Sequence, residues 1–599
     1  MARWQHDENI NKHKTIDETT PLIPAGPTTV DASLETEIDT HSSGSTPRKS
    51  SGSTTPDLPS NDDDDHTTAN QSLPTARAII CTVALGCLIF LQATNISLLT
   101  TTQSAIADDL DAHDKTTWFT SSYLIAMSAL GPLNGKLASV FSPRICMLAS
   151  AIFLALGAIL ASSANGFGAF VAGRAVIGVG ASGVFTISII LVLELTGSKR
   201  RGVAVGLLNS GYTVGVAVGA TAAGALLPVI GWRALFWAQA PIAFFAGLVL
   251  YLAIPHDFTA GHTGESGHGT LKRLGRLDYF GAITLTVSIV LLLFAMSNPV
   301  RILVTPIILS AVVLLTFLIN EIHFAHDPII PVTLLKSRGL LLTCLGTVGY
   351  MMARWSVLFY APTYAIAVRQ WSPATAGSIL IPTNGGFAIG GLLVGWLHIK
   401  RKGSFYVPSV VCYALFPCTL VALALLSTQQ SSPALFVLVV FLCGAVTGAA
   451  LNYNLAHLLH LTPKNTHYVA TSLLATFRGF AGSFGSAIGG GLFTRSLNTS
   501  LTKHFGKEGM EHKRALIRQL LGSPALVGKL QSAEKEIAIR GYENALKVLW
   551  LSAAALALVT VFVQAGTGWT GHQKTSVLEE ERARLMDDGE VSEEPAAQG

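Results

Sequence analysis

The first thing this sequence lacks is charge. Only 13% of its 599 residues are charged, whereas 50% are hydrophobic and the mean hydropathy is +0.48. A soluble chain of this length needs far more charge to cover its surface, so the composition excludes an ordinary soluble protein and indicates one that lies in a lipid bilayer. The net charge of +4 shows no excess of positive charge of the kind that binds nucleic acid.

Cysteine is also scarce, and its positions exclude two further classes of protein. None of the seven cysteines lies in a long hydrophilic loop, so we expect neither a disulfide framework nor a zinc site. The chain has no phosphate-binding loop and no nucleophile elbow, which argues against an ATP-driven pump and against an enzyme. We therefore expect no metal and no cofactor.

Long apolar runs are what the chain has in abundance. A membrane-spanning helix needs about 17–25 mostly apolar residues, and by that rule the sequence predicts about 14 spans. Glycine is frequent, with 56 residues, as expected where helices pack closely in lipid. The predicted spans begin near Ala78, Thr117, Ile145, Phe167, Val203, Arg233, Asp278, Ile302, Leu340, Pro373, Phe405, Ala434, Tyr468 and Ala545.

The short loops between these runs alternate in positive charge. Lys and Arg gather in every second loop, at Lys136 with Arg144, at 199–201, at 272–276 and at 400–402. Such loops face the cytosol, and an even number of spans then places both ends of the chain in the cytosol. The first loop on the opposite side is acidic instead, with aspartates between 108 and 114.

One connection, 496–544, is long and hydrophilic and lies on the predicted non-cytosolic side. It contains the amphipathic run 514–521, in which apolar residues recur at helical spacing. We expect this run to form a surface helix packed on the membrane face. Asn498 begins the tripeptide Asn-Thr-Ser, which predicts a glycosylation site on the same side.

Two spans carry features that point to transport. Arg174 lies inside the fourth predicted span, where a charged group is costly and needs an anion, a carbonyl group or water. It is either a structural arginine bonded to neighbouring backbone or a part of proton or substrate coupling. The fifth span has small residues that line one helix face as a groove for another helix. Its glycines are Gly202, Gly211, Gly215, Gly219 and Gly224.

The fifth span resembles the antiporter motif of the major facilitator superfamily, with Ala220 and Ala223 where the family usually has proline and glycine. The segment around Arg174 resembles the fourth-span motif of the same family. Further matches resemble the 14-span drug:proton antiporter branch, and the resemblance covers roughly 78–565. They are Gly231-Trp-Arg-Ala-Leu-Phe-Trp-Ala-Gln-Ala-Pro241, Asp278-Tyr-Phe-Gly281, Asp327-Pro-Ile-Ile-Pro331, Ala376-Gly377 with Pro382, Arg478-Gly-Phe-Ala-Gly-Ser-Phe-Gly485 and Tyr542-Glu-Asn-Ala-Leu546.

The resemblance implies an all-α membrane protein of the major facilitator fold, with the solute site between two six-helix bundles. It implies a monomer that works by alternating access and whose partners are the lipid bilayer and a small solute. The implied parts are a cytosolic tail at 1–77, the N-terminal bundle at 78–254, a cytosolic loop at 255–277, two linking helices at 278–323, the C-terminal bundle at 338–566, which includes the loop 496–544, and a cytosolic tail at 567–599.

Two departures from the family pattern weaken parts of this expectation. In the loop from Gly135 to Arg144, Ser139 stands in place of the aspartate that the family carries in its charge relay. Glu194 could still pair with Lys136 or Arg144. The first span contains no acid where drug exporters of this branch usually have an aspartate, so a cation site built on a buried carboxylate is not expected.

Several polar side chains remain as candidates for the transport site. Roles in transport or coupling are expected for Arg174, Glu194, Arg354 and Arg478. Arg354 lies near the middle of a span and should face a cavity, because facing lipid costs at least about 2.5 kcal/mol; its alternative is a helix-end residue that reaches the interface. Neutral candidates for the solute cavity, each of which could instead bond a neighbouring helix, are Asn95, Gln103, Asn209, Gln239, Asn384 and Asn452.

The N-terminal tail is hydrophilic, and this composition predicts that it is disordered. Within it, Glu18 with Leu22 and Ile23 resembles the acidic dileucine signal that adaptor complexes read when they sort proteins to vacuoles. Together with the segments 94–97 and 141–144, this signal gives the chain a resemblance to the fungal vacuolar basic amino acid transporters. The first hypothesis is proton-exchange uptake of amino acids, in particular basic ones, into the vacuole. Its alternatives are efflux of a drug or metabolite at the plasma membrane, and a non-transporting nutrient sensor on the same scaffold.

Overall fold

The computed structural model describes residues 75–195, 201–254, 278–298, 301–325, 337–397, 405–462, 467–508 and 513–568. These residues form helices and no strands, and all of them lie in one compact unit, Asn70–Gly599. The predicted sorting signal at 18–23 lies outside the described residues, as does the predicted loop 255–277.

The first half of the helical unit packs as one bundle. In it, α4 lies against α5 and α7, α3 lies against α5, and α1 lies against α6 and α7. Their buried apolar side chains form one core, which includes Leu88, Leu154 and Phe236. The elements of this half are α1 (Thr75–Ser97), α2 (Leu99–Asp109), the short 3-10 helix η1 (His113–Lys115), α3 (Thr117–Val140), α4 (Pro143–Ser162), α5 (Phe167–Leu195), α6 (Arg201–Trp237) and α7 (Gln239–Ala253).

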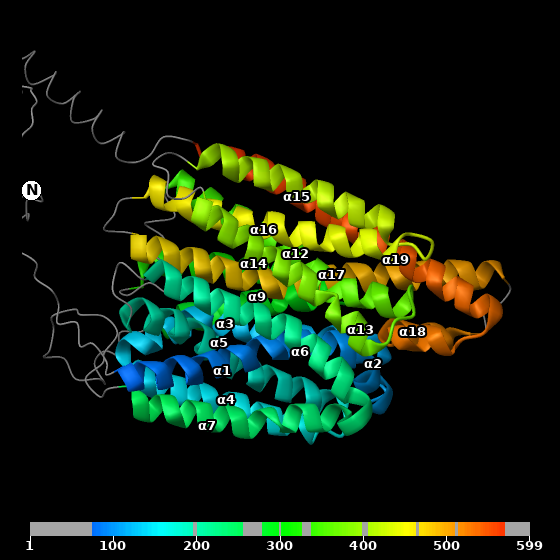
Figure 1. Ribbon diagram of the computed structural model, residues 1–599, viewed down its shortest axis with the longest axis horizontal. Helices are drawn as coiled ribbons and strands as arrows, with labels where there is room; N and C mark the ends of the chain where they lie inside the picture. The colour runs from blue at the N-terminus through cyan, green and yellow to red at the C-terminus, as the bar shows by residue number, and fades with distance from the viewer. Residues whose placement is uncertain are drawn as a thin grey trace, which may run out of the picture. The chain divides into compact units, whose positions relative to one another are not determined.

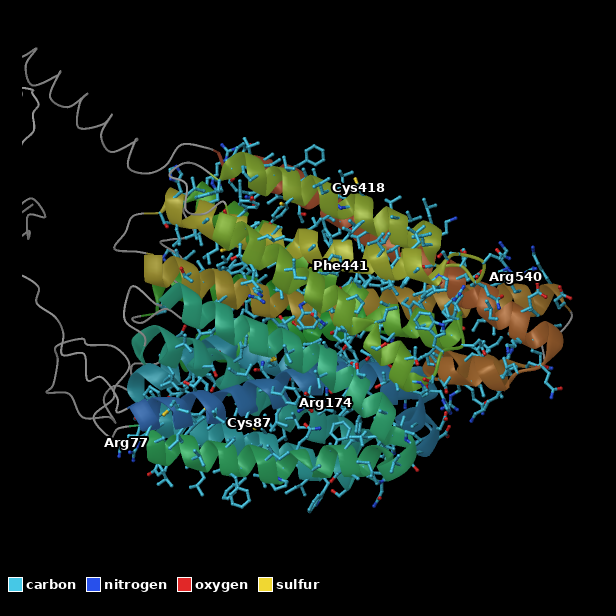
Figure 2. The ribbon with its side chains drawn as sticks, in the orientation of Figure 1. Arg77, Cys87, Arg174, Cys418, Phe441 and Arg540 are labelled. Atoms are coloured by element: carbon cyan, nitrogen blue, oxygen red, sulfur yellow. The ribbon has the colours of Figure 1, made fainter. Side chains whose placement is uncertain are left out.

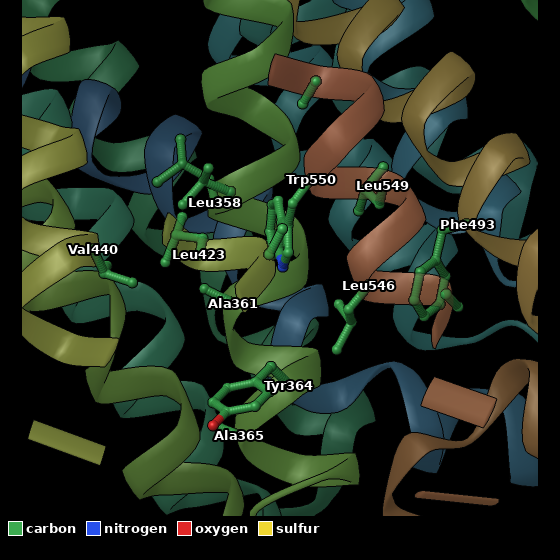
Figure 3. Close-up of a cluster of buried hydrophobic side chains, with 14 of the residues drawn as sticks. Leu358, Ala361, Tyr364, Ala365, Leu423, Val440, Phe493, Leu546, Leu549 and Trp550 are labelled. Carbon is green, nitrogen blue, oxygen red and sulfur yellow. The ribbon is translucent and has the colours of Figure 1, made fainter. Parts of the chain in front are cut away.

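The second half forms a bundle of its own around one long helix. The elements of this half are α12 (Arg338–Ala367), α13 (Pro373–Ser378), α14 (Leu380–Leu397), α15 (Tyr406–Leu426), α16 (Pro433–Leu461), α17 (His467–Lys507), α18 (Arg514–Gly522), the 3-10 helix η3 (Pro524–Lys529) and α19 (Ser532–Ala565). Helix α12 lies against α16, α17 and α19. Figure 3 shows part of the core of this half, where the Trp550 ring lies among Leu358, Leu423 and Leu549. Its indole N–H donates to the Ser427 hydroxyl over 2.9 Å, so the buried polar group is satisfied.

Two linking helices, α9 (Tyr279–Met296) and α10 (Val304–His323), lie between the two halves in the sequence. They pack on each other. Asp278 caps α9 by accepting from the Gly281 N–H over 2.8 Å, and it also accepts from the Asn320 amide of α10 over 2.7 Å. Helix α9 lies against α3 and α17. Only Ser310, Phe317 and Glu321 of α10 are buried, so its remaining side chains are placed to face lipid.

Eleven helices in the described part of the chain are long and apolar enough to cross a membrane. The count of 14 needs three more spans, and a helix lies at each expected place: α3, the end of α6 together with α7, and α17. Gly231, with a φ of 74°, bends the chain between the main part of α6 and this last piece. The all-helical membrane fold is confirmed, whereas the exact number of 14 spans stays a prediction.

The segment 496–544 differs from the loop that its polarity predicts. Helix α17 continues to Lys507, α18 forms as expected, and α19 begins at Ser532 rather than near Ala545. Helix α18 packs on η1, α2, η3 and α17, and its buried residues Ile517 and Leu520 belong to the apolar core of the second half. Asn498 lies within α17, so the predicted glycosylation site falls on a helix; its modification stays a prediction.

Elements from both halves meet at one end of the helical unit. Figure 1 shows α2, α13 and α18 gathered there. Contacts between the halves at this end join α6 to α13, α2 to α13, and α18 to η1, while α3 lies against α17. Because this end carries the acidic segment 108–114, it is the predicted non-cytosolic end.

Candidate functional site: two chambers between the halves

A cavity lies between the halves and is lined from both, and we call it the central chamber. Its volume is about 50 Å³, which is room for a few water molecules rather than for an organic solute. An organic solute would therefore enter only when the halves move apart. The lining residues are Leu124, Met127, Phe185, Tyr212, Thr213 and Val216 of the first half, and Met351, Arg354, Trp355, Leu358, Asn384, Phe387, Arg478, Gly479 and Gly482 of the second.

Arg354 is a charged group in the wall of the central chamber. It lies well inside α12 and is 4% exposed, so it is not a helix-end residue. Its guanidinium donates to the Thr447 hydroxyl over 3.1 Å and to the Asn384 side-chain oxygen over 3.2 Å. The guanidinium carbon also lies 4.3 Å from the centre of the Phe387 ring, a cation–π contact. These three partners are uncharged, so none of them neutralises the arginine.

Arg478 lines the same chamber from α17. The small residues that follow it allow close packing: the Gly479 carbonyl accepts from the Ser128 hydroxyl of α3 over 3.0 Å, a hydrogen bond between the halves. A Cβ at Gly482 would come within 3.3 Å of the Trp355 ring. The sequence signal Arg478–Gly485 therefore marks the place where α17 approaches both α3 and α12.

Arg174 lies inside the first half (Figure 2) and does not line the central chamber. It is fully buried, and each of its three nitrogens donates a hydrogen bond of 3.0 Å: Nε to the Phe119 carbonyl, Nη1 to the Asn95 side-chain oxygen and Nη2 to the Asn95 carbonyl. Its guanidinium carbon lies 4.6 Å from the centre of the Tyr123 ring. This is the bonding pattern of a structural arginine that ties α5 to α1 and α3.

The neutral candidates for solute recognition divide among several places. Asn384 lines the central chamber and accepts from the guanidinium described above. Asn95 donates to the Gln239 side-chain oxygen, so both belong to the buried network of Arg174. Asn452 donates to a carbonyl of its own helix over 3.1 Å. The side chain of Asn209 lies outside the described residues.

A second cavity, of about 40 Å³, lies between the halves nearer the predicted non-cytosolic end, and we call it the threonine chamber. Gln103 lies in its wall, and the hydroxyls of Thr117 and Thr494 are 3.5 Å apart across the two halves. Hydroxyl and amide groups without charge dominate its polar lining. The lining residues are Thr100, Gln103, Thr116, Thr117, Thr120, Phe359, Tyr360, Thr363, Ser486, Phe493, Thr494, Leu521 and Pro524.

The segment 514–529, which contains α18 and η3 and which we call the cap, covers the threonine chamber. The Arg518 guanidinium lies 3.3 Å from the Asp114 carboxylate of the first half. The Gln103 amide donates to the Gly522 carbonyl over 3.5 Å, and a Cβ at Gly522 would lie within 3 Å of the His113 backbone. The cap thus belongs to the second half but touches the first.

The glycines of α6 serve two different contacts. At Gly215, an added Cβ would lie 2.7 Å from the Ala93 Cβ of α1, so this contact lies within the first half. At Gly224, an added Cβ would come within 3 Å of the Pro373 backbone in α13, so this contact joins the halves. Gly219 packs on α1 as Gly215 does, whereas Gly211 has no atom within 4 Å of an added Cβ. The groove expected from the sequence exists at three of these glycines.

The expected charge relay is only partly described. A Cβ added at Gly135 would meet only a Thr186 methyl group, at the ordinary contact distance of 3.5 Å. The Arg144 guanidinium is buried over the Tyr251 ring of α7, 4.5 Å from the ring centre. The side chains of Lys136 and Glu194 lie outside the described residues, so their pairing stays a prediction.

Comparison with known proteins decides the family. The profile described as Major Facilitator Superfamily matches residues 85–486, well over half of the chain. The chain belongs to the major facilitator superfamily.

The curated relatives of this major facilitator include fungal efflux pumps. The MFS-type efflux pump LUC4 of Fusarium sp is 27% identical over 460 residues, which cover 75% of this chain and 79% of the relative. The efflux pump apf11 of Gibberella fujikuroi is 26% identical, covering 82% of this chain and 88% of the relative. Vacuolar basic amino acid transporter 1 of Saccharomyces cerevisiae is 28% identical, covering 52% of this chain and 55% of the relative. The chain is therefore a multi-pass membrane transporter of small solutes.

A solved structure supports the fold of this major facilitator. A bacterial homologue of the human lysosomal transporter Spinster, in an inward-facing and occupied conformation, aligns with a TM-score of 0.58. The sequences are 13% identical, and the alignment covers 83% of this chain and 97% of that one. At this identity the likeness shows the fold alone.

Sequence reasoning found the charged groups of the central chamber but missed most of its wall. Tyr212 and Phe387 of that wall were not singled out, nor was Thr447, which accepts from Arg354 behind it, because aromatic and hydroxyl residues are common in membrane helices. Trp355 offered a signal, since it directly follows an intramembrane arginine. The threonine chamber was missed because its wall comes from six separate elements, which no local sequence pattern connects.

Proposed function

We propose that this transporter exports a small organic solute from the cytosol by alternating access, in exchange for protons. The observation that carries the proposal is the central chamber, which has side chains of both halves in its wall. A site shared by two halves changes its exposure when one half rocks against the other. The efflux-pump relatives, which match over most of both chains, support this direction of transport.

The solute's outward route would run through the threonine chamber and past the cap. That chamber lies between the central chamber and the predicted non-cytosolic end, and Leu521 and Pro524 of the cap stand in its wall. The described contacts at this end, from Gly224 to α13 and from Arg518 to Asp114, would have to separate before release. The route therefore makes the cap a part that moves during each cycle.

A second candidate is the uptake of basic amino acids into the vacuole, supported by the vacuolar relative and by the predicted signal with Leu22 and Ile23. This reaction also moves the solute out of the cytosol, so the two candidates differ in membrane and in solute. Tagged wild-type protein and a variant with both residues changed to alanine would separate them. Vacuolar wild type with a displaced variant supports the second candidate, and plasma-membrane wild type argues against it.

The transport proposal itself is tested with purified protein in proteoliposomes under an imposed pH gradient. We expect solute movement that stops when the gradient is collapsed with an ionophore. Movement that survives the collapse would contradict proton exchange while keeping transport. No movement for any member of a chemically broad panel would favour the nutrient-sensor alternative.

A further inference from the structure

A third cavity lies between α17 and α19, where these helices extend beyond α15 and α16 at the predicted non-cytosolic end (Figure 1), and we call it the lateral groove. Its volume is about 520 Å³, more than ten times that of either chamber and within the range of ligand sites. The Asn544 amide donates to the Ser500 hydroxyl over 3.4 Å, which places these two positions at the same level. The lining residues are Leu492, Arg495, Ser496, Thr499, Ser500, Lys503, His504, Arg540 and Asn544.

The lateral groove is basic. Its nine lining residues include Arg495, Lys503, His504 and Arg540 and no acid. Lys503 is exposed and forms no ion pair in the described part of the chain. Arg540 pairs with Glu536 of its own helix, but both side chains are more than 60% exposed, so this pair holds the arginine only weakly. The surplus of positive charge suits an anion.

The end of α9 marks the depth of the lateral groove in the membrane. Helix α9 has 18 residues, and its length of about 27 Å matches the hydrocarbon core of a bilayer. The Arg495 guanidinium donates to the Met296 and Asn298 carbonyls at the end of α9, each over 2.9 Å. Lys503 lies two turns further out, and its side chain leaves the backbone toward the membrane, because Cα–Cβ bonds tilt toward the helix N-terminus. The groove therefore lies at the level of lipid headgroups.

The face of α19 that lines the groove continues into the membrane as apolar surface. Two steps of seven residues lead from Asn544 to Leu551 and Leu558, which lie on the same helix face and are 43% and 52% exposed. On α17, Leu492 forms the inner part of the wall, one turn before Ser496. The surface is thus basic at headgroup level and apolar below it, in the same order as the parts of a lipid.

We propose that the lateral groove binds an acidic phospholipid of the non-cytosolic leaflet. Its phosphate lies between Arg495 and Lys503, because guanidinium and ammonium groups both bind phosphate oxygens. Its acyl chains lie along Leu551 and Leu558. A free anion fits less well, since it would leave this apolar surface unused. The proposal does not depend on the solute or on the direction of transport.

Native mass spectrometry of the full chain in detergent micelles tests the proposal with two lipids of equal chains, dioleoylphosphatidylglycerol and dioleoylphosphatidylcholine. We expect the first to bind about tenfold more tightly, because the choline of the second places a cation in a basic groove. The double variant Lys503→Gln with Arg540→Gln should lose most of this preference, and it should fold because both side chains are exposed. Leu551→Gln should weaken both lipids alike.

The control is the double variant Arg514→Gln with Lys529→Gln, which removes the same charge from exposed positions of the cap, outside the groove. Its lipid preference should equal that of the wild type. Equal affinity for the two lipids would overturn the proposal, as would equal loss of preference in the two double variants. Inorganic phosphate and glycerophosphoglycerol, the headgroup without chains, separate the sources of the anion. Displacement of the lipid by either at a concentration near that of the lipid would assign the groove to a free anion and overturn the lipid.

Discussion

Arg174 and Arg354 are both buried arginines in apolar helices, yet the structure uses them differently. Arg174 lies inside one half, and all three of its nitrogens bond to the Phe119 and Asn95 acceptors. Arg354 lies in the wall between the halves and bonds two neutral side chains. The first arginine holds three helices of a rigid body together, while the second faces the space in which a solute would bind.

The same division runs through other contacts of the molecule. Gly215 packs within the first half, and Gly377 packs across the halves, where an added Cβ would lie 2.6 Å from the Ala220 carbonyl oxygen. Contacts inside a half should persist through the transport cycle, whereas contacts between halves at the closed end should break in every cycle. Substitutions of the first kind should therefore lower stability, and those of the second kind should change transport.

The largest expected effect is that of Arg174→Leu. The substitution leaves the Phe119 and Asn95 acceptors buried without their donor, and we expect it to lower the free energy of unfolding by about 2–4 kcal/mol. Transport should be lost as well. The measurement is the thermal unfolding midpoint of purified protein, together with flux. Arg301→Leu, at an exposed position, is the matched control and should unfold as the wild type does.

An unchanged midpoint with lost flux would contradict this view of Arg174. It would support instead a role of Arg174 in proton or substrate coupling, which its position inside a span also allows. Normal flux with a normal midpoint would show that the Phe119 and Asn95 acceptors bond to other donors in the variant.

The next effect is that of Gly215→Leu, for which Gly211→Leu in the same helix is the control. A side chain at the first position would enter α1 at Ala93, whereas the second position has no atom within 4 Å of an added Cβ. Overpacking of this kind costs about 1–3 kcal/mol, so the first variant should show less folded protein and a lower unfolding midpoint. Equal behaviour of the two variants would argue that α1 and α6 shift easily relative to each other.

The sequence predicted the helices well, because membrane spans are long apolar runs whose ends are marked by charge and glycine. The predicted starts at Thr117, Phe167 and Pro373 coincide with helix starts in the structure. The helix that contains the span predicted from Ala545 begins earlier, at Ser532, because a polar stretch continues the helix beyond the apolar run. Where this helix enters the lipid stays a prediction. Hydropathy marks where lipid begins and carries no information on where a helix ends in water.

The site was less predictable than the fold. Burial in the membrane singled out Arg174 and Arg354 alike, because the cost of an intramembrane charge is the same for a structural and a functional arginine. Only the packing of α1, α3 and α5 shows that each nitrogen of the first donates to an acceptor of its own half. Chamber walls depend on which faces of distant helices meet, and one sequence without its fold does not contain that information in any local pattern.

A substitution between the halves should separate transport from stability. Gly377→Val places atoms where the Ala220 carbonyl lies when the predicted non-cytosolic end is closed, and it should disfavour that closed state. We expect at least a tenfold loss of flux with an unfolding midpoint near that of the wild type. A cysteine at Thr117, in the threonine chamber, should react several-fold faster with an impermeant maleimide in this variant.

Gly385→Val is the control for this prediction, since Gly385 lies in α14 with no atom within 4 Å of an added Cβ. It should label and transport as the wild type does. Slower labelling in the Gly377 variant would mean that the contact of α6 with α13 does not close this end of the protein.

The smallest expected effect is that of the ion pair between the cap and the first half. Arg518 and Asp114 are 50% and 36% exposed, so the pair should contribute only about 0.2–1 kcal/mol to closure, and salt should weaken it. Asp114→Asn should therefore speed maleimide labelling of the threonine chamber by at most about fivefold at low salt, with little change at 1 M salt.

The pair of Glu536 with Arg540 lies within α19 alone, so Glu536→Gln should leave labelling unchanged. Reversing both charges, as Asp114→Arg with Arg518→Asp, should restore slow labelling if the pair itself holds the cap; a double variant as fast as the single one would place the contribution of the cap in its packing on His113 instead.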